Sequence, residues 1–345
     1  MGPRSGRHVR SRRSEEAPVS WLIPVRDGAR WLCEAVTSAL AECGSGDEVV
    51  VVDDGSTDDP AAVLPADRRL VLLRQDRRGL VAALEAGRLA CRNPLLARLD
   101  ADDVALPGRI EAQHTALAAD PSLAAVGGRA RLRRDSGPVP EGMARYVEWV
   151  NGLSSPEEIA REILVESPLF HPATTIRAEA LAAVGGWRDG DLPEDYDLWL
   201  RLHGAGWKLG NVPREVVLLR DRPDRLTRTD PRYRRSAFAA CKMDFVSRHL
   251  LPGRTSIAVW GAGRTGRPWI RWLVGQGAPV VAVLDLRSGG ERQGRPVLPV
   301  EAVAELRVDL LLVAVGARGA RDEIRAMLGR VRPDLREGVD WFAVA

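Results

Sequence analysis

A run of carboxylates, Asp100-Ala101-Asp102-Asp103, directly follows the apolar segment Leu95–Leu99. Carboxylates held close together repel one another unless a hard cation neutralises them. Mg²⁺ or Mn²⁺ held by one or two carboxylates keeps positions open for water and phosphate oxygens. Such a site can bind a diphosphate and stabilise it as a leaving group. The run therefore predicts a divalent-metal site, and the alternative is a solvated turn in which the aspartates cap a helix.

Glycines recur near the C-terminal end, in Gly261-Ala262-Gly263-Arg264-Thr265-Gly266. The predicted strand Ser256–Val259 precedes them, the predicted helix Arg267–Val274 follows, and Asp285 ends the next predicted strand. This order is typical of a dinucleotide-binding turn, where an anion approaches the helix N-terminus. The residues that would bind NAD or another nucleotide are Gly261, Gly263, Gly266 and Asp285. Alternatively, the glycines only pack the first helical turn of an accessory domain.

Short apolar strands alternate with amphipathic helices from Ser20 onward. This alternation predicts an α/β fold with a parallel sheet that is covered by helices on both faces. Binding sites in such sheets lie at the carboxyl ends of the strands, where the acidic clusters occur. The predicted strands are Ser20–Val25, Glu48–Val52, Leu70–Leu73 and Leu95–Leu99, and the predicted helices are Ala29–Cys43, Gly79–Arg92 and Asp195–His203.

Four segments follow from this pattern. Residues 1–17 are rich in Arg, Ser and Gly and are predicted to be a disordered basic tail. Residues 18–230 form the main α/β domain. Residues 231–253 are predicted to be a helical linker that Pro252-Gly253 ends. Residues 254–345 begin a fresh strand-turn-helix unit and are predicted to be a small Rossmann-like α/β domain.

The charge of the 345-residue chain is unevenly distributed. The formal net charge of +3 equals the excess of five arginines over two glutamates in residues 1–16. Because the body itself is not basic, this charge distribution argues against a dedicated nucleic-acid-binding protein, and no nucleic-acid partner is predicted. The acidic excess of residues 17–253 instead favours binding of an anionic substrate through a cation. The tail is either a solvated leader or a peripheral contact with an anionic membrane.

Targeting and cysteine signals are weak. No apolar run reaches the length of a membrane helix, and no apolar stretch follows the N-terminal charges. The four cysteines lack zinc or CxxC spacing, and Cys33 and Cys91 lie in apolar helical patterns that predict buried thiols. These features predict a cytoplasmic protein with at most peripheral membrane contact. The sequence predicts no oligomeric state.

Five short motifs occur in order between residues 18 and 230. They are Ile23–Gly28, Val51–Asp58, Gly79–Leu84, Ala97–Asp103 and Glu194–Arg201. Together they closely resemble family 2 glycosyltransferases of the GT-A fold, also called the nucleotide-diphospho-sugar transferase fold. The resemblance implies a mixed, mainly parallel sheet, a nucleoside-diphosphate sugar as donor, and inversion at the anomeric carbon.

The resemblance also implies a binding site for the donor. Pro24, Val25 and Arg26 would frame the nucleobase, and Asp54 would contact the base. Many members have Arg-Asn where this chain has Leu84-Glu85, so Arg77 or Arg78 is the candidate to contact phosphate instead, unless these arginines are only solvated; Arg78 is the one assigned to the donor site. The DxD element would bind the nucleotide sugar through Asp100, Ala101 and Asp102, and Mg²⁺ or Mn²⁺ through Asp102 and Asp103.

Asp195 would be the general base, by the same resemblance. A sugar hydroxyl is a poor nucleophile and needs a positioned carboxylate to take its proton. The alternative is an acidic first-turn residue that the helix dipole favours. His171, in Phe170-His171-Pro172, lines the acceptor side or the metal, or is a structural histidine. The absence of both a QxxRW motif and membrane helices argues against a processive synthase.

The sequence thus favours transfer of a single sugar to an acceptor hydroxyl on a glycan, a lipid-linked sugar or a small molecule. Two alternatives remain open. One is a bifunctional or regulated protein whose C-terminal domain binds NAD or a nucleotide sugar. The other is a nucleotidyltransferase, which can also use carboxylates and a metal.

Overall fold

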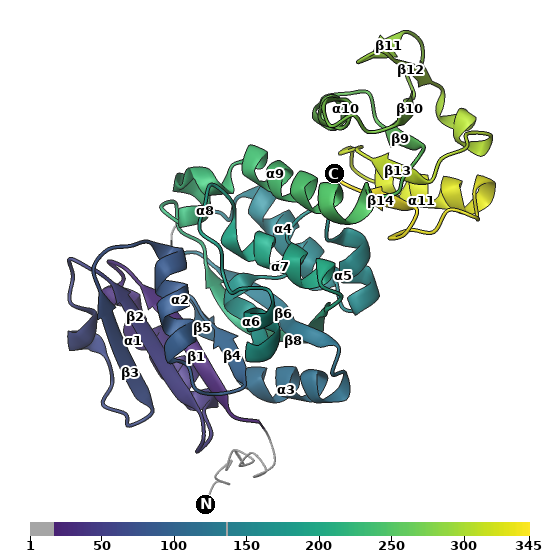
Figure 1. Ribbon diagram of the computed structural model, residues 1–345. Coiled ribbons are helices and arrows are strands. Elements are labelled where there is room, and N and C mark those ends of the chain that lie inside the picture. Colours follow the sequence, from purple (N-terminus) through teal and green to yellow (C-terminus); the bar gives the residue numbers. More distant parts are fainter. Residues whose placement is uncertain (1–16, 136) are drawn as a thin grey trace, which may run out of the picture. The chain divides into compact units, whose positions relative to one another are not determined.

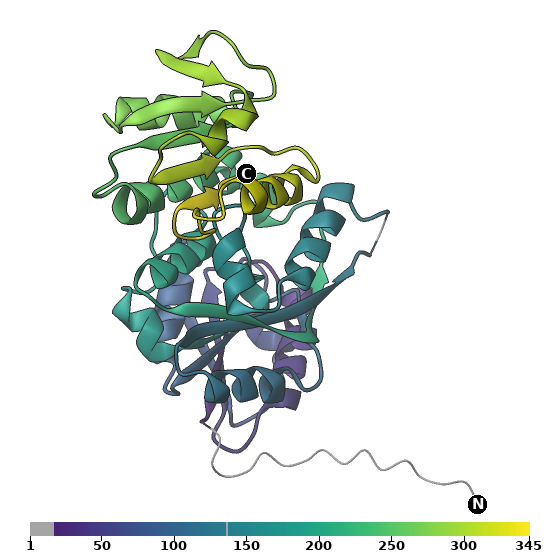
Figure 2. The same ribbon diagram turned by 90° about the vertical axis from the view of Figure 1, so that its right-hand side faces the viewer.

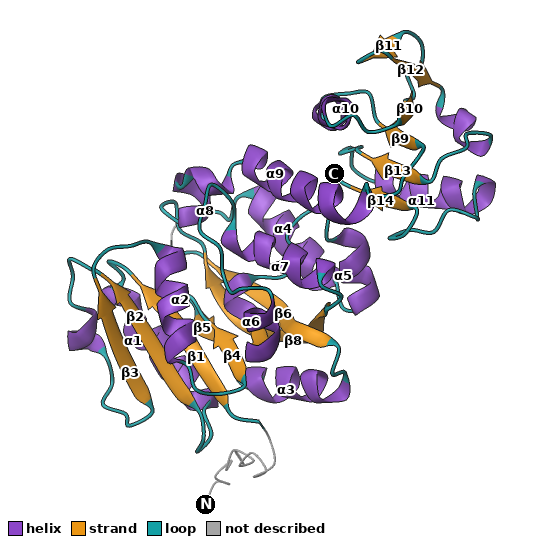
Figure 3. Ribbon diagram, viewed as in Figure 1, coloured by secondary structure: helices purple, strands orange, loops and turns teal. Residues whose placement is uncertain are grey.

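The computed structural model describes residues 17–135 and 137–345, so the predicted basic tail lies outside the described residues except for Ala17. The chain divides into two compact units. Figures 1 and 3 label their helices and strands. The first unit comprises the chain up to Pro156, Leu169–Gly190 and Ala205–Thr229, and the second comprises Glu157–Pro168, Asp191–Gly204 and Asp230–Ala345.

An eight-stranded mixed sheet forms the centre of the first unit, in the order β3-β2-β1-β4-β7-β6-β8-β5. β3, β2, β1 and β4 run parallel to one another, whereas β7 is antiparallel to both β4 and β6. This arrangement confirms the predicted mixed sheet of the GT-A type. The strands are β1 Val19–Val25, β2 Glu48–Asp54, β3 Leu70–Gln75, β4 Leu95–Arg98, β5 Val104–Ala105, β6 Leu123–Arg133, β7 Thr175–Arg177 and β8 Lys208–Arg220.

The carboxyl ends of β1, β2 and β4 lie at one edge of this sheet. Val25 is paired with Asp53, and Leu22 is paired with Arg98. Because the strands are parallel, the loops that follow them emerge side by side. The predicted acidic clusters therefore meet at a single edge.

Helices cover both faces of the sheet, as the sequence predicts. One stripe of α1 packs with alternate residues of β1, such as Trp21 and Ile23, and α2 packs on the opposite face, where Leu84 is fully buried. The helices of this unit are α1 Ala29–Glu42, α2 Leu80–Ala90, α3 Arg109–Ala119, α4 Glu141–Gly152, α6 Ala178–Ala183 and α8 Leu226–Thr229, with the short turns η1 Pro60–Val63 and η2 His171–Ala173.

Two cysteines were predicted to be buried, and the prediction is wrong for Cys33. Cys33 is exposed, whereas Leu32, Ala35 and Val36 of the same helix are fully buried. Its position is outside the apolar stripe, because the helical rotation turns it toward solvent. Cys91 is half-buried at the C-terminal end of α2.

The second unit contains a six-stranded sheet in the order β11-β12-β10-β9-β13-β14, drawn green to yellow in Figure 2. The strands from β12 to β14 are parallel, and only β11 runs antiparallel to its neighbour. Helices α7 and α9 of this unit pack against each other. Its helices are α5 Pro156–Glu162, α7 Glu194–Gly204, α9 Arg235–Phe245, α10 Gly266–Gly275 and α11 Ala320–Val331, with the turns η3 Pro231–Tyr233, η4 Val246–Leu250 and η5 Val300–Ala304.

This second sheet lies within the segment 254–345, where the sequence predicts a separate α/β domain. Its strands are β9 Ile257–Trp260, β10 Val280–Leu284, β11 Glu291–Arg292, β12 Arg295–Leu298, β13 Leu310–Val313 and β14 Trp341–Ala343. The compact unit is larger than this segment, because it also contains α7 and most of α5. The domain boundaries at residues 230 and 253 therefore stay a prediction from the sequence. Among the described residues, none of the helices has the length and apolar character of a bilayer span.

Candidate active site

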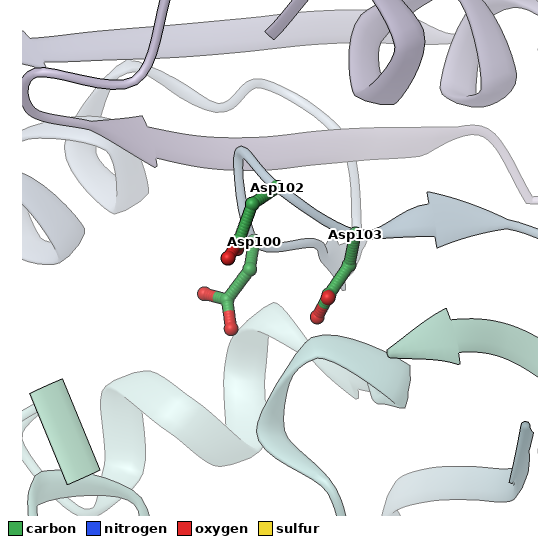
Figure 4. A group of neighbouring side chains, drawn as sticks. All are labelled: Asp100, Asp102 and Asp103. Carbon is green, nitrogen blue, oxygen red and sulfur yellow. The ribbon is translucent and has the colours of Figure 1, made fainter. Parts of the chain in front are cut away.

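Three carboxylates lie together just beyond β4. Oxygens of Asp100, Asp102 and Asp103 come within 4.8 Å of one another. Among residues 17–135 and 137–345, these three form the only group of His, Cys, Asp or Glu side chains that could hold a metal ion in this way. Figure 4 shows the three side chains extending to the same side of the turn. The sequence-predicted DxD element is therefore a spatial cluster. Because the carboxylates are this close, their charges repel unless cations compensate them.

Arginine side chains surround this cluster. Arg98 donates through Nη2 to Oδ1 of Asp100 at 2.6 Å, and Arg222 donates through Nε to Oδ2 of Asp102 at 2.8 Å. Burial opposes the charge on Asp100, but Arg98 and Arg225 outweigh it and hold the pKa of Asp100 below its ordinary value. Asp100 is thus an ionised partner of arginine.

The negative charges of Asp102 and Asp103 are less well compensated by the surrounding arginines than that of Asp100. Burial and the negative charge of Asp100 raise the pKa of Asp102, and burial together with the charges of Asp102 and Asp100 raises that of Asp103 well above its ordinary value. Oδ1 of Asp103 accepts the backbone N–H of Arg220 at 2.7 Å, but its buried Oδ2 has no hydrogen-bond partner. An unpartnered buried carboxylate oxygen among other carboxylates fits the all-oxygen ligand set of Mg²⁺ or Mn²⁺.

The loops after β1 and β2 are joined at the same sheet edge. Asp27, held at φ 50°, accepts hydrogen bonds from the backbone N–H and the hydroxyl of Thr57. Its own N–H donates to Ser56 Oγ at 3.0 Å. Of the predicted nucleobase-framing residues, Pro24 and Val25 are buried in β1 and Arg26 is exposed just beyond it.

Asp54 anchors the turn that leads into α2. Its carboxylate accepts the backbone N–H groups of Arg78 and Gly79, each at 2.8 Å, and the side-chain amide of Gln75 at 2.7 Å. The side chain of Arg78 is exposed. The structure thus brings Asp54 and Arg78 together through the backbone, an arrangement that the sequence did not predict.

A tryptophan between two arginines adjoins the cluster. The guanidinium carbons of Arg30 and Arg222 lie 3.5 and 3.9 Å from the ring centroid of Trp31. Cation–π contact of this kind orients Arg222 while it binds Asp102. Sequence reasoning missed this contact and placed Trp31 only within the predicted helix Ala29–Cys43. The available signal was an aromatic residue in the first helical turn after a predicted nucleotide-binding loop.

His171 is buried close to Arg98 and Asp100. Its Nε2 accepts a hydrogen bond from Trp187 Nε1–H at 3.2 Å. Burial, supported by the charge of Arg98, lowers the pKa of His171 well below its ordinary value, so the imidazole is neutral. The hydrogen bond from Trp187 places the imidazole proton on the other ring nitrogen.

The predicted general base, Asp195, lies in the first turn of α7, in the second unit. Its Oδ1 accepts the backbone N–H of Tyr196 at 2.7 Å. Burial and the adjacent charge of Glu194 raise the pKa of Asp195 to about 8. A carboxylate with such a high proton affinity suits general-base chemistry near neutral pH.

The glycine-rich turn before α10 has a tight backbone. A Cβ on Gly266 would lie 1.7 Å from the carbonyl oxygen of Gly261, whereas one on Gly263 would meet no atom within 4 Å. Asp285 accepts the backbone N–H of Ala262 at 2.6 Å, so its carboxylate supports the turn. The fold thus requires glycine at positions 261 and 266, whereas packing gives no reason for a glycine at position 263.

Comparison with known proteins identifies the first unit. Residues 20–185 match the family model "Glycosyl transferase family 2". An uncharacterized glycosyltransferase of Haemophilus influenzae is 30% identical over 203 residues, which cover 57% of this chain and 72% of the relative. The Escherichia coli UDP-Gal:alpha-D-GlcNAc-diphosphoundecaprenol beta-1,3-galactosyltransferase is 26% identical over 215 residues, covering 60% of this chain and 76% of the relative.

Solved structures give a weaker likeness. The mannosyltransferase PcManGT from Pyrobaculum calidifontis, in complex with GDP-Man and Mn²⁺, aligns with a TM-score of 0.47 at 18% identity, over 69% of this chain and 63% of that one. The sequence matches, together with the mixed sheet and the acidic cluster at its edge, identify the enzyme class. The chain belongs to the family 2 glycosyltransferases.

Proposed function

We propose that this enzyme transfers a single sugar, with inversion, from a nucleoside-diphosphate sugar to an acceptor hydroxyl, and that it requires a divalent cation. The observation that carries the proposal is the compact carboxylate cluster with its unpartnered buried oxygen on Asp103. A nucleotidyltransferase is less well supported, because the family match extends over the whole predicted donor site.

Asp102 and Asp103 would hold Mg²⁺ or Mn²⁺. Bound there, the cation would neutralise the charge that develops on the diphosphate leaving group. Asp100 has a different task, because Arg98 already pairs with it. It keeps a guanidinium at the edge of the site and contributes negative charge to the cation's surroundings.

The donor nucleotide would bind over the adjoining loops. Pro24, Val25 and Arg26 follow or end β1, and Asp54 stiffens the neighbouring turn through three hydrogen bonds. This rigidity favours a preformed base-binding surface. The exposed side chain of Arg78 is available to the phosphates, and the backbone of Ala101 links the two DxD carboxylates.

Asp195 would take the proton of the acceptor hydroxyl. As the acceptor oxygen forms its bond to the anomeric carbon, the bond from that carbon to the diphosphate oxygen breaks, and the nucleoside diphosphate leaves with the electron pair. Asp195→Asn should abolish transfer, by roughly 10²–10⁴-fold, and leave donor binding intact. Undiminished turnover in this variant would contradict the assignment.

A lipid-linked sugar is the acceptor that we favour among the three classes. The Escherichia coli relative is named for action on a diphosphoundecaprenol-linked sugar. Such an acceptor is consistent with a cytoplasmic enzyme that contacts the membrane peripherally.

The experiment for the metal is donor hydrolysis with a panel of nucleotide sugars, with Mn²⁺ or Mg²⁺ added and with a chelator. We expect one donor to be hydrolysed, and the chelator to remove the activity. Asp103→Asn should weaken Mn²⁺ binding in calorimetry, whereas Glu111→Gln, an exposed carboxylate on α3, should not. Activity that persists in chelator would refute metal dependence.

A second candidate function is nucleotide binding at the turn before α10. The specific observation in its favour is Gly263, where no neighbouring atom requires a glycine. Close approach of a dinucleotide such as NAD would require one. In the full chain, NAD should bind, and Gly263→Val should abolish that binding without lowering the melting temperature. Absence of NAD binding to the unaltered protein would leave these glycines with structural roles only.

A further inference from the structure

Two adjacent carboxylates begin α7 and differ in their surroundings. Glu194 is only 2% exposed, and its Oε2 accepts a hydrogen bond from the phenol of Tyr233 at 2.7 Å. Asp195 is half-buried and accepts the backbone N–H of Tyr196. Tyr233 belongs to the turn η3, which lies 39 residues further along the chain from Glu194. A tertiary contact therefore distinguishes two neighbouring acids.

The charged groups around this pair are mostly acidic. Glu194 and Glu166 act on Asp195, and Tyr233 and Cys241 lie close enough to be affected by its charge. Arg232 contributes positive charge toward Glu194 and Tyr233. Two neighbouring carboxylates that are largely removed from water repel each other when both are ionised, and this costs free energy. The carboxylate that receives a phenol hydrogen bond keeps its charge more easily, so the proton goes to the other.

We propose that Tyr233 is a positioning residue for this pair: its phenol fixes Glu194 and thereby leaves Asp195 as the carboxylate that accepts the proton of the sugar hydroxyl. This inference rests on the proposed function of Asp195 as general base. Tyr233 keeps its own proton throughout. The proton of the acceptor moves to Asp195 and leaves to solvent after the nucleoside diphosphate has gone.

Removal of the phenol hydroxyl gives the first test. In Tyr233→Phe, the doubly ionised pair loses a hydrogen bond, whereas the form that shares one proton can move that proton to Glu194. Asp195 is then ionised while Glu194 holds the proton, so the rising limb of the kcat profile against pH should shift to lower pH. The KM for the donor should not change.

Glu194→Gln gives a second test, with a shift in the same direction. This variant removes the negative charge beside Asp195 but keeps an oxygen that accepts the phenol hydrogen bond. The rising limb should then shift to lower pH. If Tyr233→Phe fails to fold, this variant still tests the pair.

Tyr196→Phe is the matched control, because Tyr196 also donates a buried hydrogen bond at 2.7 Å, to the carbonyl of Ile163. This variant should lower the melting temperature and should not shift the rising limb of the kcat profile against pH. A limb that stays in place in both Tyr233→Phe and Glu194→Gln would overturn the inference. If Asp195→Asn stays active, the assignment of Asp195 as general base fails. If Asp195→Asn is inactive while the rising limb is unshifted in both Tyr233→Phe and Glu194→Gln, only the role proposed for Tyr233 fails.

Discussion

Arg222 donates its Nε–H to Oδ2 of Asp102 at 2.8 Å, so a guanidinium occupies one of the carboxylates proposed to hold the divalent cation. The same side chain pairs with Asp224 and lies against the ring of Trp31. A cation held by Asp102 would therefore compete with Arg222 for this oxygen. A cation bound there would release the guanidinium close to the proposed diphosphate position, and diphosphates are good partners for arginine.

Arg222→Ala should strengthen the binding of Mn²⁺ alone, because it removes this competitor. We expect about a tenfold lower Kd in calorimetry, equal to about 1.4 kcal/mol. Binding of inorganic pyrophosphate in the presence of Mn²⁺ should weaken at the same time. Arg145→Ala removes an exposed ion pair on α4 and serves as the control that changes neither affinity. Unchanged Mn²⁺ affinity in Arg222→Ala would show that Arg222 and the cation do not compete.

The raised pKa of Asp195 predicts how stability varies with pH. In the folded state this pKa is about 8, against an ordinary value of 3.8, so the folded chain binds more protons between these limits. The contribution of Asp195 to the free energy of unfolding therefore declines as pH rises from about 4 to about 8. Asn cannot ionise, and so Asp195→Asn should be more stable than the wild type at pH 8, by roughly 1–2 kcal/mol once partial exposure to solvent is allowed for.

Urea unfolding at pH 4.5 and at pH 8 measures this difference. The variant and the wild type should converge at the lower pH. Asp189→Asn, at an exposed position, is the control with no pH-dependent difference. A variant less stable than the wild type at pH 8 would show that the ionised Asp195 carboxylate does not destabilise the folded chain. The expected gain reflects a trade-off, because the ionised carboxylate that the proposed catalysis needs is costly to bury.

The sequence was sufficient to predict the features that depend on local pattern. The strands that end at Asp54 and Arg98 stop within two residues of the ends predicted from their apolar runs, and parallel pairing brings the acidic residues at these ends to one edge. The DxD cluster follows from three residues in a single turn. The mixed sheet followed from the resemblance to the GT-A family.

Features that depend on distant pairs could not be predicted in this way. Arg222 reaches Asp102 across 120 residues, and Tyr233 reaches Glu194 across 39. No spacing rule links such partners, because the long-range fold brings them together. The exposure of Cys33 shows a different limit: an apolar helical pattern does not locate the edge of its stripe to within one residue.

The turn before α10 gives a prediction about packing. Gly266→Ala places a methyl group 1.7 Å from the carbonyl oxygen of Gly261, a distance that the backbone cannot accept without moving. We expect a loss of roughly 2–4 kcal/mol in the free energy of unfolding, in the range of severe steric substitutions. The control is Gly275→Ala in the same helix, where a Cβ meets nothing within 4 Å and alanine favours the helix. Equal stability of the two variants would contradict this account of the turn.

Arg325 joins α11 to α5 inside the second unit, and its removal should be costly. Its guanidinium donates to Glu337 at 2.9 Å and also binds Glu162, which is 7% exposed. Arg325→Met would leave both carboxylates without this cation, although Arg321 stays 3.7 Å from Glu162. Loss of one partner from a buried ion pair costs about 3–5 kcal/mol, and we expect the lower end of this range because Arg321 remains.

A double-mutant cycle checks that the loss arises from charge. If Glu162 is the carboxylate left unpaired, Arg325→Met should cost clearly less in a Glu162→Gln background than in the wild type, by about 1–2 kcal/mol, since the buried charge is then absent. Arg336→Ala removes an exposed pair with Asp340 and should change the free energy of unfolding by less than about 1 kcal/mol. Strict additivity of the two substitutions would mean that Arg325 acts through packing of its aliphatic stem, and that the ion pairs between α5 and α11 contribute little to holding the second unit together.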